Sequence, residues 1–238
     1  IVLGPLSLRQ FTNIFFKKEL ISIIPNFIDT ENVLRKINSC SKSAVLQELN
    51  IQQGMPVITM IGRLVPGKRF DAFISILARC AETAKKKLAG LIIGDGPLRP
   101  ELETLARKYS PTVDFHFLGY QRDVFKYLAV SDVFLFTTAH EVLPMALLEA
   151  LSAGVPIVCS DIPQNRNIIQ EGYNGYLAGA AEELYVDRIL KILNNKNIAH
   201  ALSAHGLEVA KTKFDKRIVL DETIKLYKKL MCQNSFNV

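Results

Sequence analysis

Cysteine is scarce in this chain, and the few cysteines stand far apart. The four residues are Cys40, Cys80, Cys159 and Cys232, and none forms a CxxC pair. Such spacings fit neither a disulfide framework nor a structural zinc site. The sequence therefore predicts reduced thiols and a cytoplasmic protein.

Long apolar runs are missing as well. No stretch approaches the roughly 20 apolar residues that a membrane-spanning helix requires. Arg9, Lys17 and Lys18 interrupt the hydrophobic N-terminus, which excludes a secretory signal there. The chain opens on Ile1-Val-Leu-Gly4 without an initiator methionine, so we expect a fragment of a longer protein.

The excess of positive charge is moderate, at +6. It suits anionic small molecules or an acidic membrane surface, and it is too diffuse to indicate nucleic acid. Basic residues gather at 85–87, 211–217 and 225–229. They fit solvated helix faces, and they also permit peripheral contact with the inner face of a membrane.

Apolar runs rich in Val, Ile and Phe alternate with helical patterns along most of the chain. This alternation predicts an α/β fold, a Rossmann-like parallel sheet with helices on both faces. Strands are expected at 56–61, 88–93, 113–118, 133–137, 155–159 and 175–177. Helices are expected at 69–80, 98–109, 122–130, 144–153, 164–170, 181–194, 198–211 and 215–231. A separate strand is expected at 21–24.

Charged and glycine-containing segments follow the first predicted strand. In an open parallel sheet, ligands bind outside the carboxyl ends of the strands, where helix N-termini point at them. Gly62 and Arg63 follow the strand directly, and Lys68 opens the next helix. The two cations can converge on one anion such as a diphosphate, with charge-assisted hydrogen bonds. The alternative is an ordinary solvated loop.

The second and third strand ends carry weaker signals. Gly94-Asp-Gly-Pro97 predicts a tight turn in which Pro97 starts a helix and Asp95 caps it. Gly94 serves either a close approach of ligand or the turn alone. Tyr120 follows the third strand and either stacks on a base or packs on the surface.

Two carboxylates flank the turn after the fourth strand, and seven residues separate Glu141 from Glu149. A carboxylate accepts hydrogen bonds from adjacent hydroxyls, which suits a hexose edge for Glu141 and a ribose diol for Glu149. Pro144 has no amide hydrogen, so Met145 and Ala146 are the expected free donors at the positive end of the helix dipole.

Residues 57–231 resemble the C-terminal, donor-binding domain of the retaining group 1 glycosyltransferases, which have the GT-B fold. The resemblance is carried by Gly62-Arg-Leu-x-x-Gly-Lys68, Gly94-Asp-Gly-Pro97, Glu141-x7-Glu149 and Gly172-x-Asn-Gly175. Val142 departs from it, because the family usually has glycine after the first glutamate.

The resemblance implies roles for these residues. Arg63 and Lys68 would hold the diphosphate of a nucleotide sugar, Glu149 its ribose and Glu141 the transferred sugar. The backbone after Glu141, including Leu143, would line the donor site. Arg63, Lys68 and Glu141 would be the catalytic group. The co-substrate would be a UDP-sugar, no metal is expected, and the chain has no Asp-x-Asp motif.

The expected organisation has three parts. Residues 1–28 would be a remnant of the acceptor domain and the crossover, 29–55 a linker, and 56–238 the donor-binding domain. The missing N-terminal domain would bind a saccharide or lipid-linked acceptor. The hypothesis is the donor half of a retaining glycosyltransferase that transfers a hexose.

Two alternatives belong to other classes. One is a non-catalytic nucleotide-sugar binding module, or a subunit that needs a partner chain. The other is the cofactor domain of an oxidoreductase. The latter is disfavoured, because Gly94-x-Gly96 is followed by Leu98-Arg99 and not by the third glycine of the dinucleotide fingerprint.

Overall fold

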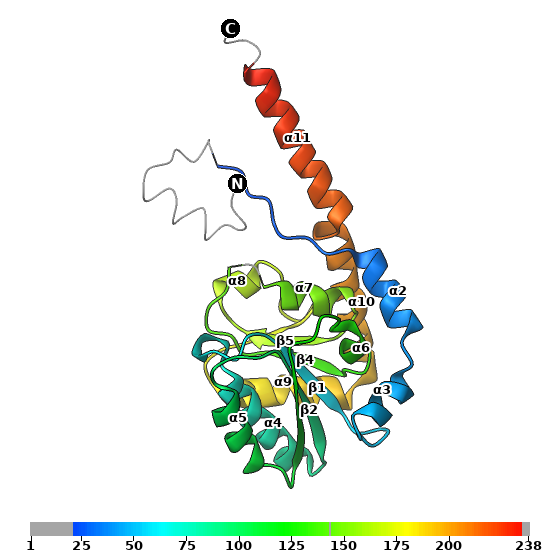
Figure 1. Ribbon diagram of the computed structural model, residues 1–238, viewed down its shortest axis with the longest axis vertical. Helices are drawn as coiled ribbons and strands as arrows, with labels where there is room; N and C mark the ends of the chain where they lie inside the picture. Colours follow the sequence, from blue (N-terminus) through cyan, green and yellow to red (C-terminus); the bar gives the residue numbers. More distant parts are fainter. Residues whose placement is uncertain (1–20, 143, 235–238) are drawn as a thin grey trace.

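The computed structural model describes residues 21–142 and 144–234. In this part of the chain, six parallel strands form one sheet in the order β3-β2-β1-β4-β5-β6 (Figure 1). The strands are β1 Val57–Ile61, β2 Leu88–Ile93, β3 Val113–Gly119, β4 Val133–Phe136, β5 Ile157–Ser160 and β6 Tyr176–Ala178. The predicted α/β class is confirmed, and each strand expected from residue 56 onward overlaps an observed one.

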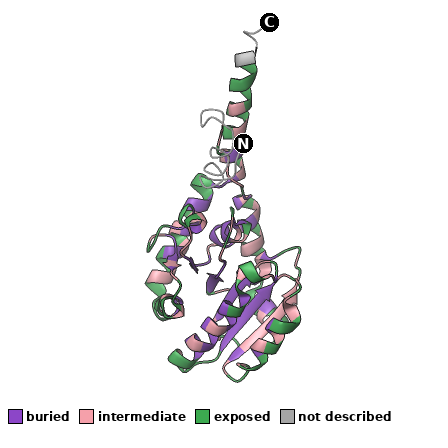
Figure 2. Cartoon of the chain, turned by 90° about the vertical axis from the view of Figure 1, so that its left-hand side faces the viewer, coloured by how far each residue is buried: buried purple, intermediate pink, exposed green. Residues whose placement is uncertain are grey.

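The central strands are apolar because helices cover both faces of the sheet. All residues of β2, β4 and β5 are buried, as are four of the five in β1. β3 lies at the edge, and only its Val113 is buried. The buried sheet stands out against the exposed helix faces in Figure 2.

The helices form two layers. The helices that follow β1, up to α10, are α4 Phe70–Ala84, α5 Arg99–Arg107, α6 Phe125–Leu128, α7 Met145–Ser152, α8 Pro163–Arg166, α9 Glu182–Asn194 and α10 Lys196–Lys213. Since crossovers between parallel strands are right-handed, α4 and α7 lie on opposite faces. α9 packs on α4, and α10 packs on α7. The strand order reverses between β1 and β4, where ligands of such sheets bind.

Two helices that were not predicted lie in the segment expected to be a linker, residues 29–55. They are α2 Thr30–Ser39 and α3 Lys42–Glu48, whose N-caps Asp29 and Ser41 accept hydrogen bonds from backbone amides. Each helix buries few apolar side chains, Val33 on α2 and Val45 on α3. The helical spacing of apolar residues was therefore too weak to predict either helix from the sequence.

The strand predicted at 21–24 is wrong. Ile23 makes an isolated bridge, and its neighbours are irregular. A short apolar run forms a strand only if another strand pairs along it, which periodicity cannot reveal. Residues 1–20 of the expected N-terminal remnant lie outside the described residues.

The segment after residue 21 is tied to the start of the last helix, α11 Lys216–Asn234. The Ile28 amide donates to Phe214 O at 2.8 Å, and the Lys216 amide donates to Ile28 O at 2.9 Å. The Thr30 hydroxyl donates to buried Asp215. Burial alone would raise the pKa of Asp215, but hydrogen bonds from Thr30 and Arg217 lower it to about 2.

α11 extends away from the body of the molecule (Figure 1). Its exposed apolar side chains are Leu220, Ile224, Tyr227, Leu230 and Met231. Among the helices that the structure describes, none combines the length and apolarity needed to cross a bilayer.

Candidate functional site

The loops after β1, β2 and β3 lie side by side at the carboxyl edge of the sheet. Backbone hydrogen bonds join them: Gly62 N–H donates to Ile93 O at 2.9 Å, and Gly94 N–H donates to Gly119 O at 2.8 Å. The Leu64 amide donates to Asp95 O at 3.0 Å. Three of the predicted ligand-binding loops are therefore one connected surface.

The glycines of the second loop are explained by the close approach of two backbones. A Cβ on Gly94, which has φ +133°, would lie 1.9 Å from Gly62 O. A Cβ on Gly96 would lie 2.4 Å from Leu64 O. Of the two alternatives for Gly94, backbone geometry is sufficient, although the residue also faces the cavity described next.

Two local predictions for this loop are wrong. α5 begins at Arg99 and not at Pro97, which lies in the turn before it. Asp95 does not cap the helix, because its carboxylate accepts from the Gly96 amide at 2.8 Å and contacts Arg99 at 3.5 Å. The Leu98 amide donates instead to Leu64 O, which holds the residue before the helix against the first loop.

A cavity of about 570 Å³, here called the edge cavity, opens at this surface. Five predicted site residues line it, namely Gly62, Arg63, Gly94, Tyr120 and Glu149. Other residues that line the edge cavity were not predicted, among them Arg122 and Phe125. Arg122 is a second cation in the wall, and as one charged residue in a short loop it carries no sequence signal of its own.

Glu149 is the acid that α7 contributes to the edge cavity, as the fifth residue of the helix. Burial raises the pKa of Glu149 to about 7, and no cation or donor in the described chain offsets this effect. Its carboxylate is therefore an acceptor without a protein partner, which a ligand with adjacent hydroxyls can satisfy.

The N-terminus of α7 has the predicted free donors. Pro144 is the N-cap residue, no side chain caps the helix, and the amides of Leu147 and Leu148 both donate to Pro144 O. The amides of Met145 and Ala146 come before these first intrahelical donors, so they are available to a ligand. Leu143 lies outside the described residues.

Lys68 and Glu141 meet next to the edge cavity without lining it. The Lys68 ammonium donates to the Glu141 carboxylate, and these side chains are 24% and 11% exposed. Lys68 Nζ also lies 5.7 Å from the ring centroid of Phe136. A Cβ on Gly62 would be 3.8 Å from Lys68 Cδ, so the lysine stem runs beside the cavity.

Arg63 and Lys68 were expected to face one anion, and in this structure they do not share a cavity. Arg63 faces the edge cavity, whereas Lys68 is engaged by Glu141. The physical reason is the buried position of Glu141, since a carboxylate with so little contact with water is stabilised by the nearest cation.

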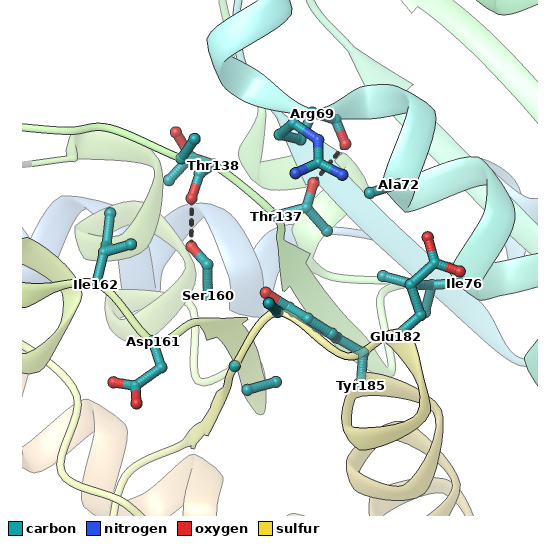
Figure 3. Close-up of a pocket in the computed structure, with 14 residues that line it drawn as sticks. Arg69, Ala72, Ile76, Thr137, Thr138, Ser160, Asp161, Ile162, Glu182 and Tyr185 are labelled. Carbon is teal, nitrogen blue, oxygen red and sulfur yellow. Dashed lines mark hydrogen bonds between the residues drawn. The ribbon is translucent and has the colours of Figure 1, made fainter.

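Figure 3 shows a second cavity, of about 280 Å³, which Lys68 and Glu141 do not line. Its wall includes Arg69, which directly follows Lys68, and Thr138, which stands three residues before Glu141. Its other polar lining residues include Ser160, Asp161, Glu182 and Tyr185. Nothing in the sequence pattern indicated this cavity.

Metal-binding side chains do not cluster within residues 21–142 and 144–234, where no three His, Cys, Asp or Glu residues come together. His205 stacks on Tyr173 with ring centroids 4.1 Å apart. The expectation that no metal is needed remains a prediction.

Comparison with known proteins identifies the family. The family model "Glycosyl transferases group 1" matches residues 41–209, about two thirds of the chain. The chain belongs to this family. The resemblance carried by the strand-end motifs is thereby confirmed.

Among curated members of the group 1 family, the chain is 29% identical over 191 residues to UDP-Gal:alpha-D-GlcNAc-diphosphoundecaprenol alpha-1,3-galactosyltransferase of Escherichia coli. This match covers 74% of the chain and 46% of the relative. LpsE of Rhizobium meliloti, a lipopolysaccharide core biosynthesis glycosyltransferase, is 26% identical over 222 residues, with 92% and 60% covered. The chain thus spans about half the length of the curated relatives it matches.

Solved structures share the fold. HepE from Anabaena, in complex with UDP and glucose, superposes with a TM-score of 0.82 at 19% identity, covering 95% of this chain and 62% of that one. WaaG, a glycosyltransferase of lipopolysaccharide biosynthesis, has a TM-score of 0.75 at 21% identity, with 89% and 58% covered. At these identities the likeness establishes the fold of one part of a GT-B glycosyltransferase.

Proposed function

We propose that this chain is the donor-binding half of a retaining glycosyltransferase, which transfers a hexose from a UDP-sugar to a polysaccharide or glycolipid acceptor. The observation that carries the proposal is the edge cavity at the reversal of strand order, where Arg63 supplies charge and Glu149 an unsatisfied acceptor. UDP in HepE and the galactosyltransferase relative support this donor class.

The nucleoside part of the donor would occupy the edge cavity. The ribose diol would donate to Glu149, because adjacent hydroxyls match the two oxygens of a carboxylate. Tyr120 is 80% exposed at the rim, which leaves its ring face available to the base.

The diphosphate would lie between Arg63 and the amides of Met145 and Ala146. It would draw Lys68 away from Glu141, which is then available to the hydroxyls of the transferred sugar. As the bond between sugar and phosphate breaks, negative charge grows on the leaving phosphate. Arg63 and Lys68 therefore stabilise the transition state more than the ground state.

Retention of configuration would follow from attack on the face that the phosphate leaves. The acceptor oxygen bonds to the anomeric carbon, the bond from that carbon to the phosphate oxygen breaks, and the acceptor proton passes to the phosphate. This path uses no protein base, and it needs no metal because cations and amides neutralise the phosphates.

The domain assignment is part of the proposal. Residues 1–28 would be the end of the acceptor domain and the crossover, 29–55 the entry, and 56–238 the donor domain. The acceptor would be bound by the preceding half, in the cytoplasm, with peripheral contact at the inner membrane face. Accordingly, the isolated 238 residues should bind donor weakly and show no sugar transfer.

Calorimetric titration tests the binding claim. We expect the chain to bind UDP in preference to NAD, and Glu149→Ala to weaken UDP binding roughly tenfold or more, because hydrogen bonds to a charged acceptor are lost. A preference for NAD, or unchanged UDP affinity in Glu149→Ala, would overturn the assignment.

The alternative function is a non-catalytic module that binds a nucleotide sugar, or a subunit that needs a partner chain. This chain alone would bind the donor, and transfer would need the other half of the fold. An assay of the full-length protein for donor turnover separates the two, with Glu141→Ala as the variant. Turnover that Glu141→Ala abolishes supports the transferase. Binding without turnover in the full-length protein supports the module.

A further inference from the structure

We propose that Thr138, Ser160 and Asn165 are positioning residues. They hold the loop of residues 137–142, here called the Glu141 loop, so that the Glu141 carboxylate meets the donor sugar. This inference rests on the proposed function. The three residues do not line the edge cavity, and they do not belong to the Lys68–Glu141 ion pair. The strand-end motifs did not predict them as ligand contacts.

The observation behind it is a group of buried polar side chains at the ends of β4 and β5. Thr137, Thr138, Ser160 and Asn165 are all buried. A buried hydroxyl or amide is costly unless it is hydrogen-bonded. The partners of these side chains therefore show what the group stabilises.

One chain of hydrogen bonds runs from α8 to the Glu141 loop. Asn165 Nδ2 donates to Ser160 O at 2.8 Å and to Ser160 Oγ at 3.1 Å. Ser160 Oγ in turn donates to Thr138 O, as Figure 3 shows. Asn165 Oδ1 has no partner in the described chain, so the orientation of this amide is set by its bonds to Ser160.

Thr138 then connects the two loops that carry the ion pair. Its Oγ1 lies 3.2 Å from Gly67 O, just before Lys68, and 3.1 Å from His140 O, just before Glu141. The Ala139 amide donates to Gly67 O at 2.9 Å. Both charged residues are therefore positioned relative to one hydroxyl.

A second hydroxyl supports the same junction. Thr137 Oγ1 lies 2.7 Å from Arg69 O, a contact drawn in Figure 3, and 3.2 Å from Lys68 O. Arg69 adopts a left-handed backbone with φ 56°. The turn around Lys68 is thus also held by Thr137, the residue that follows β4.

The need for such positioning arises when the donor binds. Residues 137–142 belong to no helix or strand, and Glu141 is held by Lys68 in the free protein. Once the diphosphate draws Lys68 away, Thr138 and the bonds behind it keep the loop in place. Ser160 reaches Glu141 only through Thr138, so its effect should appear on the sugar and not on the nucleotide.

The test compares UDP with UDP-glucose and UDP-galactose, by titration calorimetry on this chain. Ser160→Ala and Thr138→Val remove the hydroxyls, whereas Ser160→Thr and Thr138→Ser keep them as matched controls. We expect the first two variants to weaken UDP-sugar binding roughly threefold to tenfold. UDP affinity should stay within about twofold, and the controls should resemble the unmodified chain.

A double-mutant cycle shows whether Ser160 acts through Glu141. If it does, Ser160→Ala added to Glu141→Ala causes little further loss of UDP-sugar affinity, because coupled residues are not additive. A merely structural role predicts additive losses and equal weakening of UDP and UDP-sugar. Either of these results overturns the positioning role.

The two proposals can fail separately. A chain that binds no UDP overturns the proposed function and this inference with it. A chain that binds UDP through Glu149, but whose UDP-sugar affinity is unchanged by Ser160→Ala and Thr138→Val, overturns only the inference.

Discussion

Glu149 and Glu141 stand on the same strand-to-helix segment, yet the two acids are in opposite states. Glu149 faces the edge cavity with no partner among the described residues, and burial raises its pKa to about 7. Glu141 is also largely shielded from water, with a side chain 11% exposed, and Lys68 is bonded to it. Glu149 is available to a ligand, whereas Glu141 must release Lys68 before it can bind a ligand.

The difference indicates how the two ends of a donor would be recognised. On the proposed function, the ribose adds hydrogen bonds to a carboxylate that lacks them. The diphosphate and sugar instead replace an existing ion pair, so their net contribution is the difference between the bonds formed and the bond lost. The nucleoside region is preformed, and the sugar region is completed only by the whole donor.

Lys68→Ala should have the largest effect, and it should separate the two regions. We expect UDP affinity to fall roughly 10- to 100-fold, because a charge-assisted hydrogen bond to phosphate is lost. Uridine, which has no phosphate, should bind unchanged. Calorimetry with both ligands checks this, and Lys126→Ala, whose ammonium contacts Glu48 at 2.9 Å, is the matched control. Equal weakening of uridine and UDP would contradict the division.

The pH dependence of binding should identify Glu149 as the ribose acceptor. Hydroxyl donors favour the ionised carboxylate, so UDP affinity should rise as pH increases through about 7, by up to roughly tenfold between pH 5.5 and 7.5. UDP itself has a phosphate that titrates near pH 6. Glu149→Gln therefore provides the reference, and identical profiles in both proteins would exclude the role.

Ligand-free stability should show the cost of the unpaired acid. The folded-state pKa of about 7 lies above the ordinary glutamate value of 4.5, so the folded protein retains the proton and stability falls as pH rises from 4.5 to 7. This shift corresponds to roughly 3 kcal/mol. Glu149→Gln should thus be more stable at pH 8 by about 1–3 kcal/mol, and melt several degrees higher.

Thermal unfolding at two pH values measures this effect. Near pH 4.5 the protonated acid and the amide are both uncharged, so the two melting temperatures should converge. A destabilised Glu149→Gln at pH 8 would mean that the carboxylate is already satisfied in the folded protein.

Tyr120→Ala should have the smallest effect. Loss of stacking on a base should weaken UDP binding about threefold to tenfold, whereas Tyr120→Phe keeps the ring and should bind normally. Tyr227→Ala on α11 is the control, since Tyr227 is also exposed. Unchanged UDP affinity in Tyr120→Ala would favour surface packing over stacking.

Much of the fold could be predicted because the central strands are buried on both faces and read as continuous apolar runs. The helices α2 and α3 could not, since each contributes few side chains to the core. At the site, strand-end motifs identified Arg63 and Glu149, which the structure brings to one cavity. The turn at Val142 tolerates a branched residue because its backbone is not left-handed. In the described chain, the non-glycine residues with positive φ are Asn50, Arg69 and Lys85, and Val142 is not among them.

The sequence by itself determined the α/β class, the family and most element types from residue 56 onward, because burial imposes a period on each strand and helix and the motifs sit at strand ends. The tertiary structure alone decided which side chains meet. Lys68 and Glu141 are 73 positions apart, and Thr138 and Ser160 are 22 apart. The first pair forms because β4 lies beside β1, where the strand order reverses, and the second because β5 lies beside β4. No local pattern encodes either distance.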